Sequence, residues 1–308
     1  MTQFTHLHVH SHYSVLDGMS KVPDLVDKAI KMGMPAIALT DHGCMYGIKE
    51  LLDCCKKSNK KLKEKAAEEG KEFVPFKPIV GVEAYCARRH RKLRDKDLKA
   101  VNAEGKAYVL DQSGWHLILL AKNMQGYKNL IKIVSKAYTE GFYMRPRTDR
   151  VELEKYHEGL ICCSACLGGE IPRLIRSGRL DDAAAAIEWH RSIFGDDYYL
   201  ELQLHKATVE RANHETWVEQ ERVNDFLIDY SHKHGVKLVC TNDVHFVDEE
   251  HAEAHDRLIC LGTAKDLDDP RRMLYSKQEW MKTTAEMNAI FDFVPESLDN
   301  TVEVCNKV

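Results

Sequence analysis

Seven short apolar segments, separated by longer polar or amphipathic stretches, constrain the fold of this chain more than any other feature. They span residues 4–9, 36–39, 78–85, 117–121, 160–163, 198–204 and 236–240. The stretches between them include 127–138, where apolar residues recur with the three- and four-residue spacing of a helix. Strands that alternate with helices usually form parallel sheets. The sequence therefore predicts an α/β fold with a parallel, barrel-like sheet.

The alternation of strands and helices ends near residue 265. A length of 308 residues fits one large α/β barrel or two ordinary domains. We therefore predict a barrel domain over residues 1–265 and a small C-terminal extension over residues 266–308. Residues 86–114 are rich in charge and include the run Arg88-Arg89-His90-Arg91-Lys92. We predict that they form an inserted loop or hairpin, solvated and mobile rather than bound to nucleic acid.

The overall composition limits the partners of the chain. A formal net charge of −4 argues against binding nucleic acid through bulk charge, so any such binding needs a local basic patch. The longest apolar run, 117–121, falls far short of the ~18 residues that cross a membrane. The first six residues lack the charged and apolar regions of a secretory signal. We expect a cytoplasmic protein with no membrane partner and with its ten cysteines reduced.

Histidines gather at the ends of the first two predicted strands. His6, His8 and His10 alternate along the first strand, so one face carries all three side chains. His42 follows the second strand. The alternative is a chance histidine run on an exposed strand, and the nearby Asp17 argues against it. The alternation predicts that the imidazoles of His6, His8 and His10 can converge on one point.

Two carboxylates occupy comparable positions in later strands. Glu83 lies alone in the apolar strand 78–85, where a buried carboxylate is costly unless it binds a metal or another cation. Asp243 and His245 follow the last strand with alternating spacing. Imidazole and carboxylate ligands suit zinc, manganese or iron, and a carboxylate can bridge two ions. Because such ions promote displacement at phosphorus, the residues predict a polynuclear metal site for phosphoester hydrolysis.

Four motifs at these strand ends resemble the signature regions of the PHP (polymerase and histidinol phosphatase) superfamily. They read His8-x-His10-Ser11…Asp17-Gly18, Thr40-Asp41-His42-Gly43, Gly81-Val82-Glu83-Ala84 and Asn242-Asp243-Val244-His245. Flanking segments narrow the resemblance to the start of bacterial replicative DNA polymerase III alpha subunits: 10–18, 77–83, 126–130, 164–170, 241–246 and 267–270. The similarity spans essentially the whole chain, which stops where the family's polymerase core is expected to begin.

The resemblance implies nine metal ligands and a bridging role for Glu83. Cys166 stands where stand-alone PHP phosphatases have histidine, and the polymerase branch often has cysteine there. His116 precedes its predicted strand, so a capping or packing role is its alternative. Glu83, Asp243 and His245 are the implied catalytic residues. The nine implied ligands are His8, His10, Asp17, His42, Glu83, His116, Cys166, Asp243 and His245.

The resemblance also implies a distorted seven-stranded (β/α) TIM-like barrel with a trinuclear site at its C-terminal face. Three divalent ions, zinc or manganese with iron as a further option, would then support 3′–5′ proofreading exonuclease activity on single-stranded DNA. Arg145 and Arg147 are candidates for holding the phosphate. The chain would be part of a longer DNA-directed DNA polymerase, which is a nucleotidyltransferase. Its partners would be the polymerase core of that protein and other replisome subunits.

Two other functions stay open at this point. In the first, the domain binds metal but only braces the polymerase and contacts its partners. In the second, the chain is a stand-alone PHP phosphatase that acts on a small phosphate ester. The complete ligand set favours hydrolysis over a purely structural role, and the flanking segments count against the stand-alone phosphatase.

Overall fold

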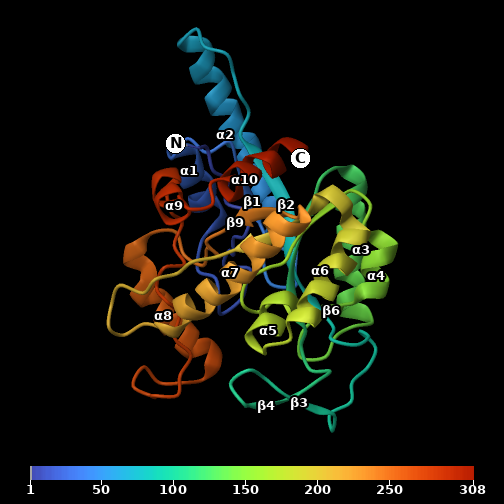
Figure 1. The fold of residues 1–308 in the computed structure, drawn as a ribbon. Coiled ribbons are helices and arrows are strands. Elements are labelled where there is room, and N and C mark those ends of the chain that lie inside the picture. Colours follow the sequence, from blue (N-terminus) through green and yellow to red (C-terminus); the bar gives the residue numbers. More distant parts are fainter. Residues whose placement is uncertain (1) are drawn as a thin grey trace.

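The computed structural model of this chain describes residues 2–308, in which helices and strands alternate along most of the sequence (Figure 1). The strands are β1 (Ala36–Leu39), β2 (Lys77–Cys86), β3 (Lys99–Val101), β4 (Ala107–Val109), β5 (Trp115–Ala121), β6 (Arg147–Thr148), β7 (Leu160–Cys163), β8 (Tyr198–Leu202) and β9 (Lys237–Cys240). The α-helices are α1 (Val22–Lys31), α2 (Ile48–Glu68), α3 (Met124–Thr139), α4 (Arg150–Tyr156), α5 (Glu170–Arg176), α6 (Leu180–Phe194), α7 (Glu215–His234), α8 (Ala252–Thr263), α9 (Thr284–Ile290) and α10 (Glu296–Lys307). Short 3-10 turns, η1 (Gly195–Asp197) and η2 (Glu249–His251), complete the regular structure.

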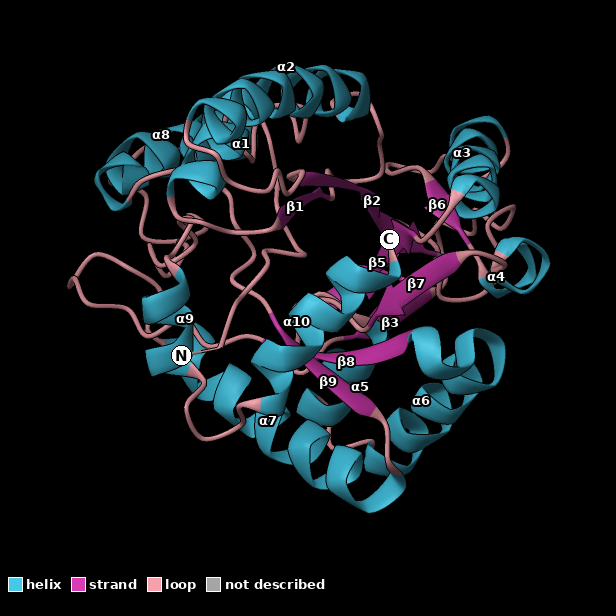
Figure 2. Cartoon of the chain, turned by 90° about the horizontal axis from the view of Figure 1, so that it is seen from above, coloured by secondary structure: helices cyan, strands magenta, loops and turns pink. Residues whose placement is uncertain are grey.

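A curled, mixed sheet forms the centre of the molecule, with helices around it (Figure 2). Within residues 2–308 its strands follow the order β1-β2-β5-β7-β8-β9, and β6 adds to β2. The predicted α/β class is confirmed, but the predicted uniformly parallel order is wrong because β5 runs antiparallel to both β2 and β7. Residues 87–114, all described, contain no helix that could carry the chain back before β5. A parallel neighbour needs such a crossover.

The N-terminal segment lies between the two edges of this strand path. Residues 4–9 make only isolated parallel bridges, from His6 to Ile37 and from Val9 to Val244, where a regular strand was predicted. The backbone N–H of Thr40 donates to the Val9 carbonyl at 2.9 Å, which ties this segment to the end of β1. The segment therefore brings the first histidine motif to the same end of the sheet as the residues that follow β1 and β9.

The sheet is buried on both faces, which explains why its strands read as continuous apolar runs. Ile37 and Leu119 pack in the cluster that lies against the surrounding helices. Their neighbours Ala38, Ile118 and Leu120 belong to a second cluster, to which every strand on the path from β1 to β9 contributes. Successive side chains of a strand alternate between the two faces of the sheet. Side chains on the inner face near the strand ends therefore point into the same space.

The insertion at 86–114 was predicted to be a loop or a hairpin. It contains the antiparallel β3–β4 hairpin. Most of its lysines and arginines are exposed, but two arginines near its start make ion pairs. The Arg89 Nε donates to Asp111 at 2.8 Å, and the buried Arg91 pairs with Asp149 at 3.1 Å and with Glu140 at 2.7 Å. The Arg91 pairs tie the start of the insertion to the body of the domain, and the Arg89 pair joins the two ends of the insertion.

The C-terminal segment packs closely on the sheet. Helix α10 lies against β9, and its Val304 and Cys305 join the inner apolar cluster (Figure 2). The division of the chain at residue 265 stays a prediction. Over residues 2–308, no helix has the length and apolar character needed to span a membrane.

Candidate metal centre

Glu83 is a buried carboxylate near the end of β2, on the inner face that it shares with Ile79. Its Oε1 lies 2.7 Å from His116 Nδ1 and 3.3 Å from His8 Nε2. Its Oε2 lies 3.6 Å from His10 Nε2 and contacts His42 Nδ1. One carboxylate thus stands among four imidazoles that come from three different segments of the chain.

Asp243, just beyond β9, is a second carboxylate at the same place. Its Oδ1 lies 3.1 Å from His8 Nε2, 3.3 Å from His10 Nε2 and 3.6 Å from His245 Nδ1. The backbone of Asp243 is left-handed, with φ of 46°. Such strained conformations persist where surrounding structure enforces them, and they gather at functional sites. Here the conformation coincides with a carboxylate turned toward three histidines.

Asp17 supplies a third carboxylate from the loop after the histidine motif. Its Oδ2 lies 2.7 Å from His42 Nε2 and 3.6 Å from His245 Nε2. The following residue must be glycine because a Cβ at Gly18 would collide with the carbonyl oxygen of Ser11. The Asp-Gly pair therefore combines a predicted ligand with the tight backbone contact that positions it.

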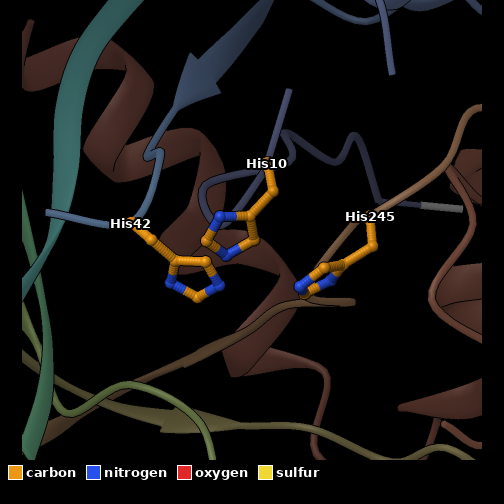
Figure 3. A group of neighbouring side chains, drawn as sticks. All are labelled: His10, His42 and His245. Carbon is orange, nitrogen blue, oxygen red and sulfur yellow. The ribbon is translucent and has the colours of Figure 1, made fainter. Parts of the chain in front are cut away.

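The rings of His10, His42 and His245 gather around one space (Figure 3). The centroid of the His10 ring lies 4.1 Å from that of His42 and 4.4 Å from that of His245. In each of three overlapping groups, the potential ligand atoms lie within 4.8 Å of one another. The groups are His10, His42 and His245; His8, His10 and Asp243; and His42, Glu83 and His116.

Cys166 completes the cluster on the side of His116. Its Sγ lies 3.5 Å from His116 Nδ1 and 3.7 Å from Glu83 Oε1. The ring of His116 faces Glu83 from the start of β5, so this side chain lies within the site. All nine residues that the resemblance implied as ligands are therefore neighbours in the structure, while their binding of metal stays a prediction.

Several of these side chains carry buried polar atoms without a hydrogen-bond partner among the described residues. They are His8 Nε2, His10 Nε2, His42 Nδ1, Glu83 Oε2 and Asp243 Oδ1. Leaving such atoms buried and unpaired is costly. Each of them faces the others across the cluster, and nitrogen and carboxylate oxygen donors suit divalent transition metals. The donor set therefore fits divalent metal ions.

The imidazoles differ in their protonation. Burial, and then the charges of His42 and His245, lowers the pKa of His10 to about 3, so this ring is neutral and can offer a lone pair. Burial also opposes ionisation of His245, but Asp243 and Asp17 outweigh it and raise its pKa to about 9. Without metal, the protonated His245 ring therefore compensates part of the negative charge of Asp243 and Asp17. A bound cation would compensate that charge instead.

The two central carboxylates are ionised in spite of their burial. Burial alone would raise the pKa of Glu83, but His116 and His42 hold it well below its usual range. In the same way, His8 and His245 overcome burial and lower the pKa of Asp243. A buried negative cluster needs compensating positive charge, which agrees with a site for cations.

Glu201 on β8 supports the cluster and was missed in the sequence. The Nδ1–H of His8 donates to Glu201 Oε1 at 2.7 Å, which leaves His8 Nε2 free to face Glu83 and Asp243. The Thr241 hydroxyl donates to the same oxygen at 2.6 Å. The signal that singled out Glu83, a lone carboxylate in an apolar strand, is equally present at Glu201.

Three further side chains hold predicted ligands in place. The Tyr275 hydroxyl, from the C-terminal segment, donates to Asp17 Oδ1 at 2.8 Å. Asp41 accepts from the Ser14 hydroxyl at 2.7 Å, and the Ser14 oxygen accepts from His10 Nδ1–H at 3.0 Å. No spacing in the sequence links Tyr275 to the histidine motifs, so only the fold identifies it.

The prediction that Arg147 binds phosphate is wrong. Its side chain is fully buried, and its guanidinium donates to backbone carbonyls, among them Gly141 at 2.8 Å and Leu93 at 3.0 Å. Arg145 is exposed instead, and its guanidinium lies 5.6 Å from the centre of the Tyr85 ring. Of the two candidates, Arg145 alone retains donors for a phosphate.

A large cavity opens onto the cluster. It has a volume of about 1280 Å³, and seven of the predicted ligands contribute to its wall. Those ligands are Asp17, His42, Glu83, His116, Cys166, Asp243 and His245. Arg145 lines the same cavity. A substrate of considerable size can therefore reach the carboxylates and imidazoles from one side.

A family model described as "PHP domain" matches residues 6–205. The chain belongs to the PHP domain family. The matched range contains every predicted ligand of this PHP domain except Asp243 and His245.

Relatives of this PHP domain are named DNA polymerase III subunit alpha. The protein of Borreliella burgdorferi is 43% identical over 307 residues, which cover 99% of this chain and 24% of the relative. Those of Treponema pallidum and Thermus aquaticus are 38% and 39% identical, and the matches cover 99% and 98% of this chain but 23% and 22% of the relatives. The resemblance to alpha subunits is confirmed, and the chain spans about a quarter of the length of these relatives.

Substitution of Glu201 by glutamine is expected to weaken metal binding by this PHP domain roughly 10–100-fold, the usual cost of losing a residue that orients a histidine ligand. The Glu201 carboxylate fixes the tautomer of His8 through Nδ1, and a neutral amide fixes it less firmly. Competition with a chromogenic chelator measures the affinity. Glu303→Gln is a matched control, because this carboxylate bonds Tyr199 and Lys237 instead. Equal affinities in both variants would contradict the assignment.

Cys166 is expected to bind cobalt as a thiolate. Burial, and then the charges of Glu83 and Asp243, raises the pKa of Cys166 well above its usual value, so only a bound cation can deprotonate it. Cobalt-loaded protein should therefore show a thiolate-to-cobalt charge-transfer band that Cys166→Ser removes. Cys163→Ser, three residues away in the buried strand β7, should keep the band. A band of equal strength in both variants would exclude Cys166 as a ligand.

Proposed function

We propose that this PHP domain is a metal-dependent phosphoesterase that shortens single-stranded DNA from its 3′ end. The observation that carries the proposal is the group of buried, unpartnered nitrogen and oxygen atoms around Glu83 and Asp243. A purely structural core would bury apolar side chains at such a place, because unpaired polar atoms are destabilising. Membership of the PHP family and the names of the relatives support phosphate chemistry on DNA.

Three divalent ions, zinc or manganese with iron as a further option, are part of the proposal. The three donor groups, which overlap at His10 and His42, would hold them. Glu83 belongs to one group and also lies within 3.6 Å of His8 and His10, so it would serve more than one ion. When bound, such ions lower the pKa of water and stabilise negative charge on phosphate oxygens. Glu83, Asp243 and His245 are the proposed catalytic residues, and all three face the cavity where the reacting phosphate would lie.

The other residues of the site would orient these groups and bind the substrate. Glu201 holds His8, Ser14 links His10 to Asp41, and Tyr275 holds Asp17. This support keeps ligand atoms in place before metal or substrate arrives, which lowers the cost of reorganisation during reaction. Arg145 would hold a phosphate at the wall of the cavity.

The proposal extends to the longer protein. We assign the chain to the N-terminal region of a DNA polymerase III alpha subunit, in which the polymerase core performs template-directed DNA synthesis. The core and other replisome subunits would be its partners, in the cytoplasm. The site would lie at the mouth of a distorted seven-stranded barrel that residues 4–9 close by bridging β1 and the segment after β9.

The test uses the purified chain, stripped of metal and then loaded with manganese or zinc. Single-stranded DNA labelled at its 5′ end should be shortened stepwise from the 3′ end, and Asp243→Asn should remove this activity, which excludes a contaminating nuclease. Metal binding without any hydrolysis would favour the structural PHP domain. Hydrolysis of a small phosphate ester but not of DNA would favour the stand-alone phosphatase.

A further inference from the structure

We infer that Tyr46, Tyr138 and Phe142 form a stacking strip for the nucleobases of single-stranded nucleic acid at the mouth of the metal cavity. The inference rests on the proposed function, and it assigns the substrate as an oligonucleotide end rather than a small phosphate ester. The three side chains line the same cavity as the metal ligands. They come from different elements: Tyr46 from the loop after β1, Tyr138 from the end of α3, and Phe142 from the loop that follows α3.

The three rings form a continuous series. The Tyr138 ring centroid lies 6.3 Å from that of Tyr46 and 6.3 Å from that of Phe142, with the latter pair inclined by only 30°. Tyr46 is 61% exposed and Phe142 is 49% exposed, although large aromatic side chains in a folded chain are usually better covered. Exposed apolar side chains that lie next to one another are typical of a surface that binds a ligand or another molecule.

Tyr85 and Arg145 line the same cavity as the strip and lie beside the metal centre. The Tyr85 ring stacks at 6.1 Å from His42 and meets His116 edge-on at 5.3 Å. The Arg145 guanidinium lies over the Tyr85 ring, 5.6 Å from its centroid, and Arg145 is three residues from Phe142. The lining of the cavity therefore combines predicted metal ligands, a guanidinium and aromatic rings.

That combination of groups matches the chemistry of a nucleic-acid strand. Proteins that bind single strands combine positive charge for the backbone with aromatic side chains on which successive bases stack. Paired bases already stack on one another, so only an unpaired end offers free faces to protein rings. A small phosphate ester would occupy the ligands and Arg145 but would leave the exposed rings without a partner.

The experiment measures binding of a thymidine octamer, labelled at its 5′ end, to the 308-residue chain in the presence of chelator, so that no hydrolysis occurs. Tyr46→Ala and Phe142→Ala should each weaken binding roughly tenfold, as expected for the loss of one stacked base. Tyr46→Phe keeps the ring and should bind like the unmodified chain. Phe293→Ala removes an equally exposed phenyl ring outside the cavity lining and should also leave binding unchanged.

An abasic octamer of the same length separates stacking from backbone attraction. It should bind more weakly than thymidine octamer, and Tyr46→Ala and Phe142→Ala should not weaken it further. Equal losses on both oligonucleotides, unchanged binding in the alanine variants, or no binding by the unmodified chain would each overturn the inference. In the last two cases the exposed rings would be a surface for contact with other protein.

Hydrolysis assays distinguish this inference from the proposed function. With manganese, the alanine variants should show a KM for single-stranded DNA about tenfold higher and an unchanged kcat, as expected when only substrate binding is lost. Base-dependent binding without hydrolysis would refute the proposed function but support the strip. Hydrolysis of DNA with the same KM in all variants would refute the strip alone.

Discussion

Replacing Glu83 with glutamine is expected to abolish hydrolysis of single-stranded DNA and to weaken metal binding more than any change to a supporting residue. Glu83 is within 3.6 Å of His8, His10 and His116, and it contacts His42. Glutamine fills the same volume but removes the shared negative charge. The loss should therefore exceed the ~10–100-fold cost of changing a residue that only orients a ligand, such as Glu201.

The measurement compares three variants in metal content, in affinity from chelator competition, and in release of nucleotides from DNA. Asp243→Asn should behave like Glu83→Gln, and because its side chain is 14% exposed it disturbs the fold less. Glu303→Gln, at a carboxylate outside the cavity lining, should match the unmodified chain. Circular dichroism checks that each variant is folded. Undiminished hydrolysis by folded Glu83→Gln would rule out a shared carboxylate at the centre.

The positions of the ligands could be predicted largely from local patterns. Alternation in the first motif places His8 and His10 together, and a carboxylate in an apolar strand needs a partner, which identifies Glu83. Both arguments depend on one element at a time. The match to motifs of a known family then added His116 and Cys166, for which local reasoning gave only weak signals. The structure brings these residues together from strands that are distant in sequence.

What could not be predicted depends on contacts between elements. The run Leu117–Ala121 is apolar whichever way the strand points, so its antiparallel direction was invisible. Tyr275 lies 258 residues from the Asp17 that it bonds. Arg147 looked like an exposed loop arginine because no sequence pattern shows that four backbone carbonyls surround it. Long-range hydrogen bonds decide such cases, and they have no local signature.

Metal binding and folding should be coupled in this domain. The unpartnered atoms of His8, His10, His42, Glu83 and Asp243 are buried in the folded chain and are hydrated in the unfolded chain. Without metal, the folded state therefore carries a desolvation cost that the unfolded state does not. With metal, the same atoms become ligands, and the cost is replaced by favourable coordination.

Loading with manganese is accordingly expected to stabilise the fold by roughly 2.7 kcal/mol for each independent site when the free metal is at ~100 times its dissociation constant. Thermal melts in chelator and in manganese measure the difference. Manganese is preferable to zinc here, because zinc also binds thiols and imidazoles of the unfolded chain, and binding to that state reduces the gain. The chain has ten cysteines and sixteen histidines, so this correction matters for zinc.

Variants connect this stabilisation to the proposed site. Asp243→Asn and Glu83→Gln should lose most of the manganese-induced rise in melting temperature, whereas Glu303→Gln should keep it. In chelator, Glu83→Gln should also be less stable than the unmodified chain, because the charge of Glu83 raises the pKa of the buried His42 and stabilises its protonated form. A rise of the same size in all three variants would mean that manganese binds elsewhere. No rise in the unmodified chain would contradict the coupling between these buried atoms and metal, and with it the hydrolytic function.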